Sequence, residues 1–168
     1  MSEATNVHIR WMIRRDVADV LAIETASFTV GTCWTEQDLI SSLRDRDTIG
    51  MVCEVASEVV GFVVCKLLKK QIEVLNMAVH PAWRRRGVGR VIIDKLVSKL
   101  SSHRRRSILI PVRESNLDMQ LFLKALYFNA VNVKRRYFED TKEDAYLFVR
   151  GLAVEDESTS AVEEVGQP

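Results

Sequence analysis

The sequence predicts one α/β domain built on a mixed, mostly antiparallel sheet with a central pair of parallel strands. The runs 49–56 and 59–68 are rich in β-branched residues and are joined by Ser57-Glu58, which predicts an antiparallel hairpin. A third β-patterned run at 71–79 precedes an amphipathic helix and then a strand at 108–112. Strand, helix and strand in that order normally form a right-handed crossover between parallel neighbours. A chain of 168 residues is long enough for one hydrophobic core and too short to favour two domains.

The N-terminal part predicts an edge strand and two helices before the hairpin. Residues 8–14 alternate well enough for an edge strand. Asp16 is placed to cap the helix that follows, whose apolar side begins at Val17. A second helix is expected where Thr35 can act as the cap while Asp38, at the third helical position, reaches back to it.

The C-terminal half predicts two more helices and a closing hairpin. The helix after residue 87 has apolar residues at spacings of three and four, namely Val88, Val91, Ile92, Leu96 and Leu100. Ser115-Asn116 can cap a helix over 117–127. Its partly buried side is expected to carry Leu121, Leu123 and Ala125. The runs 130–137 and 145–150 then look like a hairpin around 139–144.

Composition and charge bound the functions that the chain can have. Hydrophobic content of 47% with 28% charged residues is typical of a globular domain. A net charge of +1 gives no general attraction to nucleic acid, so no such partner is expected. No stretch reaches the length of a membrane span and the N-terminus lacks an apolar signal region, so no membrane partner is expected. Residues 1–152 should form the domain, and the acidic segment 153–168 has few large apolar residues and should be disordered.

The cysteines indicate a reducing compartment and no metal site. Cys33, Cys53 and Cys65 are odd in number and lack the spacing of metal ligands. Free thiols are the rule in the cytoplasm, where disulfides are rare. We therefore expect a cytoplasmic protein. We also expect it to be a monomer or a weak dimer.

A glycine and arginine cluster follows the strand 71–79 and a turn at His80-Pro81. Arg84, Gly87 and Gly89 form an R-x-x-G-x-G pattern where the next helix begins. Glycine lets backbone N–H groups converge, and the unpaired N–H groups and dipole of a helix N-terminus favour an anion. Positive charge comes from Arg84, Arg85, Arg86 and Arg90. The pattern predicts a pyrophosphate site, whereas the alternative is a surface loop of solvated arginines.

Two other phosphate loops do not fit this cluster. A P-loop needs Lys and then Ser or Thr after its second glycine, and here Arg90-Val91 follows Gly89. A dinucleotide-binding loop needs three glycines tight against its strand, and only two are present.

The segment V-x-P-x-x-R-R-x-G-V-G-R resembles the coenzyme A signature of the GCN5-related N-acetyltransferase (GNAT) superfamily. The order of elements over residues 8–150 is similar to the fold of that superfamily, which implies helices on both faces of the sheet. Further segments are similar to bacterial ribosomal-protein alanine acetyltransferases and related N-terminal acetyltransferases. These are Trp34-Thr35-Glu36, Val79-His80-Pro81, Val112 to Asn116, and Arg135 to Asp140 with Glu143-Asp144-Ala145 after it.

The resemblance implies an acetyl-CoA-dependent transfer to an amine, by direct attack in a ternary complex. It favours the α-amine of a protein or peptide N-terminus. It places the coenzyme arm along the strand before the cluster and the pyrophosphate on the backbone of the cluster. The implied coenzyme-binding residues are Met77, Ala78, Val79, Arg84, Arg85, Arg86, Gly87, Val88, Gly89, Arg90 and Asn116.

The chain departs from these relatives at both proton-transfer positions. The Glu that serves as their general base corresponds to Pro111, and the Tyr that serves as their acid corresponds to Leu123. A glycine of the same helix end corresponds to Tyr127. Pro111 also lacks a backbone N–H, which would cost a ladder hydrogen bond in a central strand. The sequence therefore leaves open a coenzyme-binding module without turnover, beside an enzyme for peptides or for small amines.

Glu73 and Tyr137 are the predicted catalytic residues. Glu73 lies on the strand where histone-type members of the superfamily carry their base. Strict alternation puts Glu73, Leu75, Met77 and Val79 on one face, where apolar neighbours would raise the pKa of the carboxyl. The alternative is a half-exposed carboxylate paired with Lys70 or Arg113.

Tyr137 matches a family Tyr that packs around the incoming peptide N-terminus, and its alternative role is cross-strand packing. Glu24 ends the first helix near Phe28, where family members line the acceptor channel. A solvated helix carboxylate is the expectation for Glu24 from its sequence position.

Overall fold

A computed structural model describes residues 5–102 and 104–151, so the predicted tail at 153–168 lies outside the described residues. The strands are β1 (His8–Trp11), β2 (Thr48–Val55), β3 (Glu58–Leu67), β4 (Gln71–Val79), β5 (Ser107–Arg113), β6 (Asn129–Lys134) and β7 (Ala145–Gly151). The helices are α1 (Val17–Ser27), α2 (Glu36–Arg44), α3 (Val88–Ser102) and α4 (Leu117–Ala125), with short 3-10 helices η1 (Arg14–Asp16) and η2 (Pro81–Trp83). Within the described ranges, no helix is both long and apolar enough to cross a membrane.

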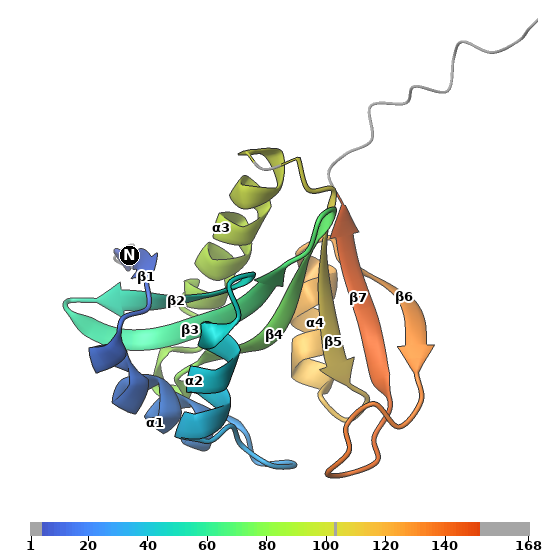
Figure 1. Ribbon diagram of the computed structural model, residues 1–168, viewed down its shortest axis with the longest axis horizontal. Coiled ribbons are helices and arrows are strands. Elements are labelled where there is room, and N and C mark those ends of the chain that lie inside the picture. Colours follow the sequence, from blue (N-terminus) through green and yellow to red (C-terminus); the bar gives the residue numbers. More distant parts are fainter. Residues whose placement is uncertain (1–4, 103, 152–168) are drawn as a thin grey trace, which may run out of the picture.

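The strands form one sheet in the order β1-β2-β3-β4-β5-β7-β6 (Figure 1). Every neighbouring pair is antiparallel except β4 and β5, which are parallel. The predicted mixed sheet with a central parallel pair is thereby confirmed. The crossover places α3 between the two parallel strands in sequence, as the strand–helix–strand pattern predicted.

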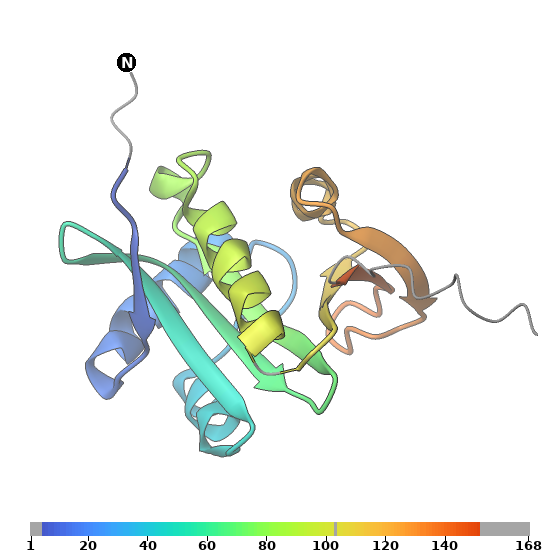
Figure 2. The same cartoon turned by 90° about the horizontal axis from the view of Figure 1, so that it is seen from above.

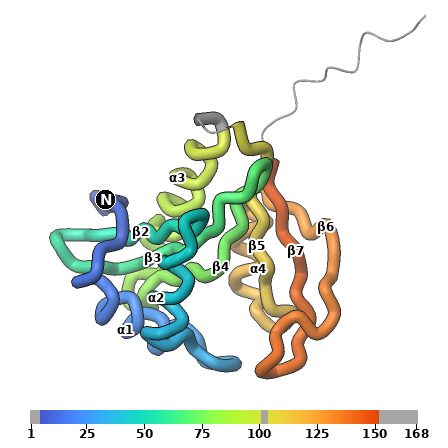
Figure 3. Tube along the Cα trace, viewed as in Figure 1, coloured from blue at the N-terminus to red at the C-terminus, as the bar shows by residue number. Residues whose placement is uncertain are grey.

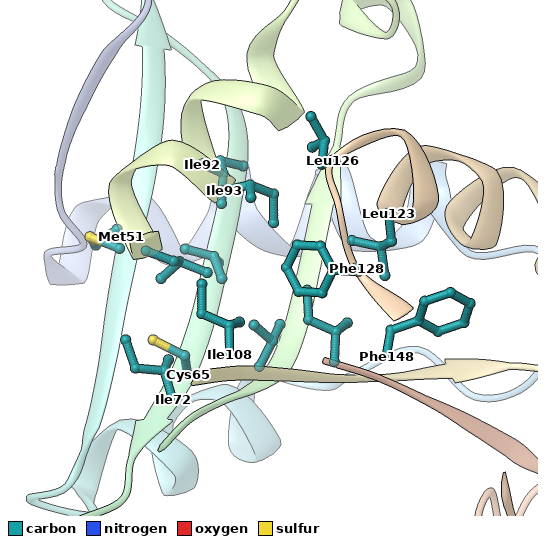
Figure 4. Packing of buried hydrophobic residues seen from close by; sticks show 14 of the residues in the cluster. Met51, Cys65, Ile72, Ile92, Ile93, Ile108, Leu123, Leu126, Phe128 and Phe148 are labelled. Atoms are coloured by element: carbon teal, nitrogen blue, oxygen red, sulfur yellow. The ribbon is translucent and has the colours of Figure 1, made fainter. Parts of the chain in front are cut away.

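Helices cover both faces of the sheet, α1 and α2 on one side and α3 and α4 on the other (Figure 2). The larger core lies under α3 and α4 (Figure 4) and includes Met51, Cys53, Cys65, Ile72, Ile92, Ile93, Leu96, Ile108, Leu123 and Phe128. The smaller core lies under α1 and α2 and includes Val20, Ile23, Leu39, Phe62, Val64 and Ala78. Burial raises the pKa of both core thiols, Cys53 and Cys65, to about 12.

A β-bulge in β4 sets which of its side chains point to which face. Val64 of β3 stands opposite Asn76, and the next pair joins Cys65 to Val74, so Leu75 is the extra residue. One extra residue exchanges the two faces for every position beyond it.

The bulge corrects the sequence prediction for this strand. Glu73, Leu75, Met77 and Val79 were predicted to share one face. Met77 and Val79 instead pack against the core of α3 and α4, which also contains Ile72 and Val74. Ala78 belongs to the core of α1 and α2. The prediction was wrong because strict alternation holds only in a strand without a bulge.

The parallel pairing of β4 and β5 lasts for three residue pairs only, from Gln71 with Ser107 to Glu73 with Leu109. Beyond these pairs the two strands separate, while β5 stays paired with β7 as far as Arg113 (Figures 1 and 3). Pro111 lies past the last pair with β4. On that side its missing N–H therefore costs no ladder bond, contrary to the expectation for a central strand.

Local signals at the helix starts are mostly confirmed. The Thr35 hydroxyl accepts from the Asp38 N–H at 3.2 Å, and the Asp38 carboxylate accepts from the Thr35 N–H at 2.8 Å. Asn116 caps α4 by accepting from the Met119 N–H at 3.1 Å. Asp16 does not cap α1, because its carboxylate is held by the Ile13 N–H and the Arg10 guanidinium.

The first hairpin turns one residue earlier than predicted. Its turn residues are Ala56 and Ser57, both with positive φ, and Glu58 already belongs to β3. On α4, only Leu123 of the three expected residues is buried, whereas Leu121 is 56% exposed and Ala125 is exposed.

We predict that Leu123→Ala lowers the free energy of unfolding by about 2–5 kcal/mol, because it leaves a cavity in the core under α4. Leu121→Ala, two residues away on the same helix, should change it by less than about 0.5 kcal/mol. Urea denaturation of the two variants measures the difference. Equal losses would contradict the packing of α4 described above.

Candidate active site

The separation of β4 from β5 opens a cleft of about 210 Å³ between them. Its walls come from five parts of the chain. They are Val74, Leu75, Asn76 and Met77 of β4; Ile110, Pro111, Val112 and Arg113 of β5; Glu24, Phe28, Val30, Thr32 and Trp34 of α1 and the loop after it; Asn116 and Met119 at the start of α4; and Phe138 before β7. Most of the lining is apolar, and Glu24 and Arg113 are the charged residues in it.

The edge of β4 that faces the cleft offers backbone groups. His80 donates its N–H to β3 at 2.8 Å, and backbone groups alternate sides along a strand. Ala78 therefore directs its N–H and carbonyl toward β3, whereas Met77 and Val79 direct theirs toward the edge that β5 has left. Of the three predicted backbone contacts for the coenzyme arm, Met77 and Val79 have this orientation.

The predicted pyrophosphate loop joins η2 to α3 and is strained in the way that close backbone approach requires. Arg85 and Gly87 have positive φ values of 59° and 85°. A Cβ added to Gly87 would meet no heavy atom of the described residues within 4 Å. Open space therefore lies at the N-terminus of α3, whose first-turn N–H groups have no intrahelical acceptor. An anion such as a diphosphate can therefore approach these N–H groups.

The other two residues at the start of α3 serve packing. Val88 is buried in the core, so only its backbone can face a ligand. A Cβ on Gly89 would lie 3.0 Å from the Phe122 ring of α4. Gly89 therefore allows α3 and α4 to approach, a role that the sequence did not reveal.

The arginines around the loop are all exposed and partly positioned. Arg84 donates from Nε to the Val79 carbonyl at 3.3 Å. The Arg86 guanidinium lies over the Trp83 ring at 5.0 Å, and Arg90 lies 4.0 Å from Asp94. Their positive charge surrounds the helix N-terminus, as an anionic ligand requires.

Glu73 acts electrostatically on Tyr137, which is 64 positions away in the chain. Glu73 belongs to the last β4–β5 pair, at the point where the strands separate. Burial raises the pKa of Tyr137, and the negative charge of Glu73 raises it further. Neither side chain is among those that line the cleft. The alternative pairing of Glu73 with Arg113 is excluded, because Arg113 is bound elsewhere.

Arg113 holds together two loops at the cleft. Its Nη1 donates to Glu143 at 3.1 Å and its Nη2 to Asp140 at 2.9 Å, and its guanidinium lies 4.0 Å from the Phe138 ring centroid. The Asp140 carboxylate also accepts from the Thr32 N–H at 2.6 Å. These bonds, led by that of Arg113, hold the pKa of Asp140 well below its usual range.

Gly31 makes this junction possible. Its φ is +80°, and an added Cβ would collide with the Asp140 carboxylate and lie 2.6 Å from Arg113 Nη2. The loop between α1 and α2 is thereby fixed against the loop between β6 and β7. The sequence pointed to the hairpin 135–145 but not to the role of Asp140 in this contact.

Glu24 is buried, only 3% exposed, which makes the expectation of a solvated carboxylate wrong. Its Oε1 accepts from the Trp34 N–H and its Oε2 from the Asn76 side-chain amide, each at 2.9 Å. Burial raises its pKa. A signal was present in the sequence, because Val20, Ile23 and Glu24 fall at i, i+3 and i+4 on the apolar side of α1.

The two positions that the family resemblance aligns with proton-transfer groups have no such group here. Pro111 lines the cleft, and Leu123 is fully buried in the core. Tyr127 is 77% exposed at the end of α4, away from the cleft lining, and has a φ of +66°. A glycine in relatives at that place is explained by this backbone conformation.

Comparison with known proteins agrees with this arrangement. Curated relatives include the [ribosomal protein bS18]-alanine N-acetyltransferase of Escherichia coli strain K12, which is 24% identical over 123 residues, covering 72% of this chain and 82% of the relative. The crystal structure of the E. coli ribosomal-protein-S18-alanine N-acetyltransferase has a TM-score of 0.77 at 20% identity, covering 90% of this chain and 97% of the other.

Other solved structures share the same fold. Ard1 from Thermoplasma volcanium has a TM-score of 0.77 at 27% identity, covering 87% of this chain and 97% of the other. Arabidopsis thaliana NAA60 in complex with acetyl-CoA has a TM-score of 0.76 at 18% identity, covering 88% and 100%. The family model for the acetyltransferase (GNAT) family matches residues 17–128, which include α1, the bulged strand, the arginine and glycine loop and α4. The chain therefore belongs to the acetyltransferase (GNAT) family and is an acetyl-CoA-dependent N-acetyltransferase.

Proposed function

We propose that this protein transfers the acetyl group of acetyl-CoA to the α-amine at the N-terminus of a protein or peptide. The observation that carries the proposal is the cleft at the parted strands, bordered by two loops that Arg113 and Asp140 hold together. A cleft fixed between two such loops can receive an extended chain end. Relatives named as alanine N-acetyltransferases and the fold shared with Arabidopsis NAA60, solved with a bisubstrate analogue, support this substrate class.

The reaction needs a thioester held beside an amine, and positioning supplies much of its acceleration. The backbone N–H groups of Met77 and Val79 would hold the coenzyme arm and polarise the thioester carbonyl. The first-turn N–H groups of α3, with the arginines around Gly87, would hold the pyrophosphate. Asn116 lines the cleft while its Oδ1 caps α4, so its amide is fixed toward the same space.

Glu73 and Tyr137 remain the proposed proton carriers at the point where the strands separate. Glu73 would accept a proton through water, and Tyr137, whose raised pKa keeps it protonated, would act as a donor near the leaving thiolate. The electrostatic effect of Glu73 on Tyr137 supports a shared role, although Pro111 and Leu123 leave the family positions without such groups.

The proposed compartment is the cytoplasm. All three cysteines are free, and Cys53 and Cys65 are buried in the core without a partner thiol. This pattern is common where thiols are kept reduced.

Release of the coenzyme A thiol tests the proposal. Acetyl-CoA is supplied with a panel of peptides of differing first residue and with small amines such as polyamines and amino sugars, and calorimetry measures acetyl-CoA binding in parallel. Turnover of peptides supports the proposal, and turnover of small amines alone overturns the substrate class. Binding without any turnover would indicate a coenzyme-binding module, which the residues at Pro111 and Leu123 would then explain.

We predict that Gly87→Ala weakens acetyl-CoA binding at least about tenfold, because a Cβ enters the space beside the α3 N-terminus and the φ of +85° disfavours a side chain. Calorimetry of the unacetylated and acetylated coenzyme measures the change. Val88 and its packing are left intact, so the unfolding midpoint should fall only slightly. Unaltered affinity would move the pyrophosphate site elsewhere.

Asp140→Asn should raise the KM for peptide at least about threefold, because it weakens the contact that fixes the Thr32 loop. Acetyl-CoA affinity should stay the same. The neighbouring Glu139→Gln is the matched control. A KM effect of equal size in both variants would show that charge alone, and not the junction, is responsible.

Glu73→Gln should lower turnover at least about tenfold with little change in acetyl-CoA binding, since it removes a base but no coenzyme contact. Steady-state kinetics and calorimetry separate the two effects. Unchanged turnover removes Glu73 from the mechanism.

A further inference from the structure

Glu24, a buried carboxylate in the wall of the cleft, has no role in the proton transfers or coenzyme contacts proposed above. The oxygens of Glu24 accept one hydrogen bond each, from the Trp34 N–H and from the Asn76 amide, both at 2.9 Å. Both donors are neutral. The side chain lies on the same cleft that the acceptor amine must enter.

No cation of the described residues balances this charge. From β3 and β4, Phe62 and Asn76 face Glu24, and from the loop after α1 the Trp34 backbone and the Cys33 thiol lie nearby. The Cys33 thiol donates to the backbone carbonyls of Glu24, at 3.9 Å, and of Phe28, at 3.6 Å, and not to the Glu24 carboxylate.

Arg113 is the other charged residue among those that line the cleft, and its charge is already balanced by ion pairs. Its guanidinium is bound to two carboxylates, Asp140 and Glu143. At the other end of α1, Asp16 is likewise paired with Arg10. The pKa of Glu24 is accordingly raised by burial and lowered only by its two hydrogen bonds, with no contribution from a charged neighbour.

Burying an anion without a counter-charge is costly, and such a group is either protonated or awaits a cation. The proposed substrate brings one, because an α-amine with a pKa near 7.7–8.0 is mostly an ammonium at neutral pH. Among the described residues that line the cleft, Glu24 is the one carboxylate that such an ammonium could bind.

We infer that Glu24 binds the α-ammonium of the acceptor and takes its first proton, and that Asn76 positions the Glu24 carboxylate. The inference rests on the proposed function. In this step a proton passes from nitrogen to the Glu24 oxygen, which leaves a neutral amine. The amine lone pair then forms the N–C bond as the C–S bond breaks. The second nitrogen proton passes through water to Glu73, while Tyr137 protonates the leaving thiolate and recovers its proton from Glu73. Glu24 afterwards releases its proton to water.

This role has a signature in the pH dependence of the reaction. At pH 7 only about one tenth of such an amine is neutral. An enzyme whose carboxylate accepts a proton from the ammonium can also use the protonated fraction of the substrate. An enzyme without Glu24 must wait for the neutral amine, and its rate should rise about tenfold per pH unit until the amine pKa is reached.

The test is kcat/KM for an N-terminal peptide measured between about pH 6 and pH 9. Glu24→Gln should lose about tenfold at pH 7 and regain most of it near pH 9, because free amine is then abundant. Asp19→Asn, an exposed carboxylate on the same helix, should follow the wild-type profile. Asn76→Ala keeps Glu24 but removes one hydrogen bond to its anion, and should shift the acidic limb of the profile upward by about half to one pH unit.

A second readout does not depend on activity. The folded-state pKa of Glu24 is raised, so its contribution to stability is fully present below the ordinary carboxyl pKa and is lost as pH rises through the raised value. The stability of the wild type relative to Glu24→Gln should therefore fall with pH over that window. Denaturation at several pH values measures this difference.

The outcomes separate the two proposals. Wild-type turnover with a Glu24→Gln loss that is absent, or equal at every pH, overturns the role of Glu24 and leaves the proposed function standing. A wild type that acetylates no amine overturns both. A Glu24→Gln profile that converges on the wild type at high pH, together with the Asn76→Ala shift, supports the inference.

Discussion

The shortness of the parallel pairing between β4 and β5 is the constraint on which the rest of the structure depends. After three residue pairs, the two halves of the sheet separate, and each of them remains paired on its outer side. A parted sheet exposes unpaired backbone groups, which are costly when nothing binds them. The bulge at Leu75 turns the Asn76 side chain toward α1. The backbone N–H and carbonyl groups of Met77 and Val79 point to the gap. The gap therefore follows from the pairing of the strands. Its unpaired backbone groups can bind a polar, extended ligand.

The carboxylates around Arg113 and the single carboxylate of Glu24 have opposite electrostatic surroundings. Around Arg113, opposite charges are matched, and the matched set fixes the geometry of two loops. Around Glu24, neutral donors hold a carboxylate that no cation within residues 5–102 and 104–151 balances. The first arrangement gives rigidity, whereas the second stores unfavourable energy that an incoming cation can relieve. Arg113 and Glu24 both line the cleft, so one site combines a rigid ion-pair cluster with a carboxylate whose pKa is raised by burial.

Sequence patterns foretold the fold well where the signal was local. The Thr35 and Asn116 caps, the bounds of β4 and the glycine start of α3 all follow from short-range chemistry. The site was harder, because it depends on pairing between distant segments. The bulge at Leu75 inverts the face of half a strand, and no residue type announces it. Gly89 has a reason only once Phe122 of another helix is in place.

The reactivity of the two core thiols, Cys53 and Cys65, reports on the opening of the sheet. Cys53 and Cys65 lie on the paired strands β2 and β3, fully buried, and a thiol with a pKa of about 12 is nearly inert toward alkylating reagents. Labelling of either residue must wait until this half of the sheet comes apart from α3. Cys33, which is half-buried in the loop beside Glu24, reports on a much smaller excursion. The labelling rate of Cys33 therefore measures local opening of the cleft loop. The labelling rates of Cys53 and Cys65 measure unfolding of the half-sheet that supports it.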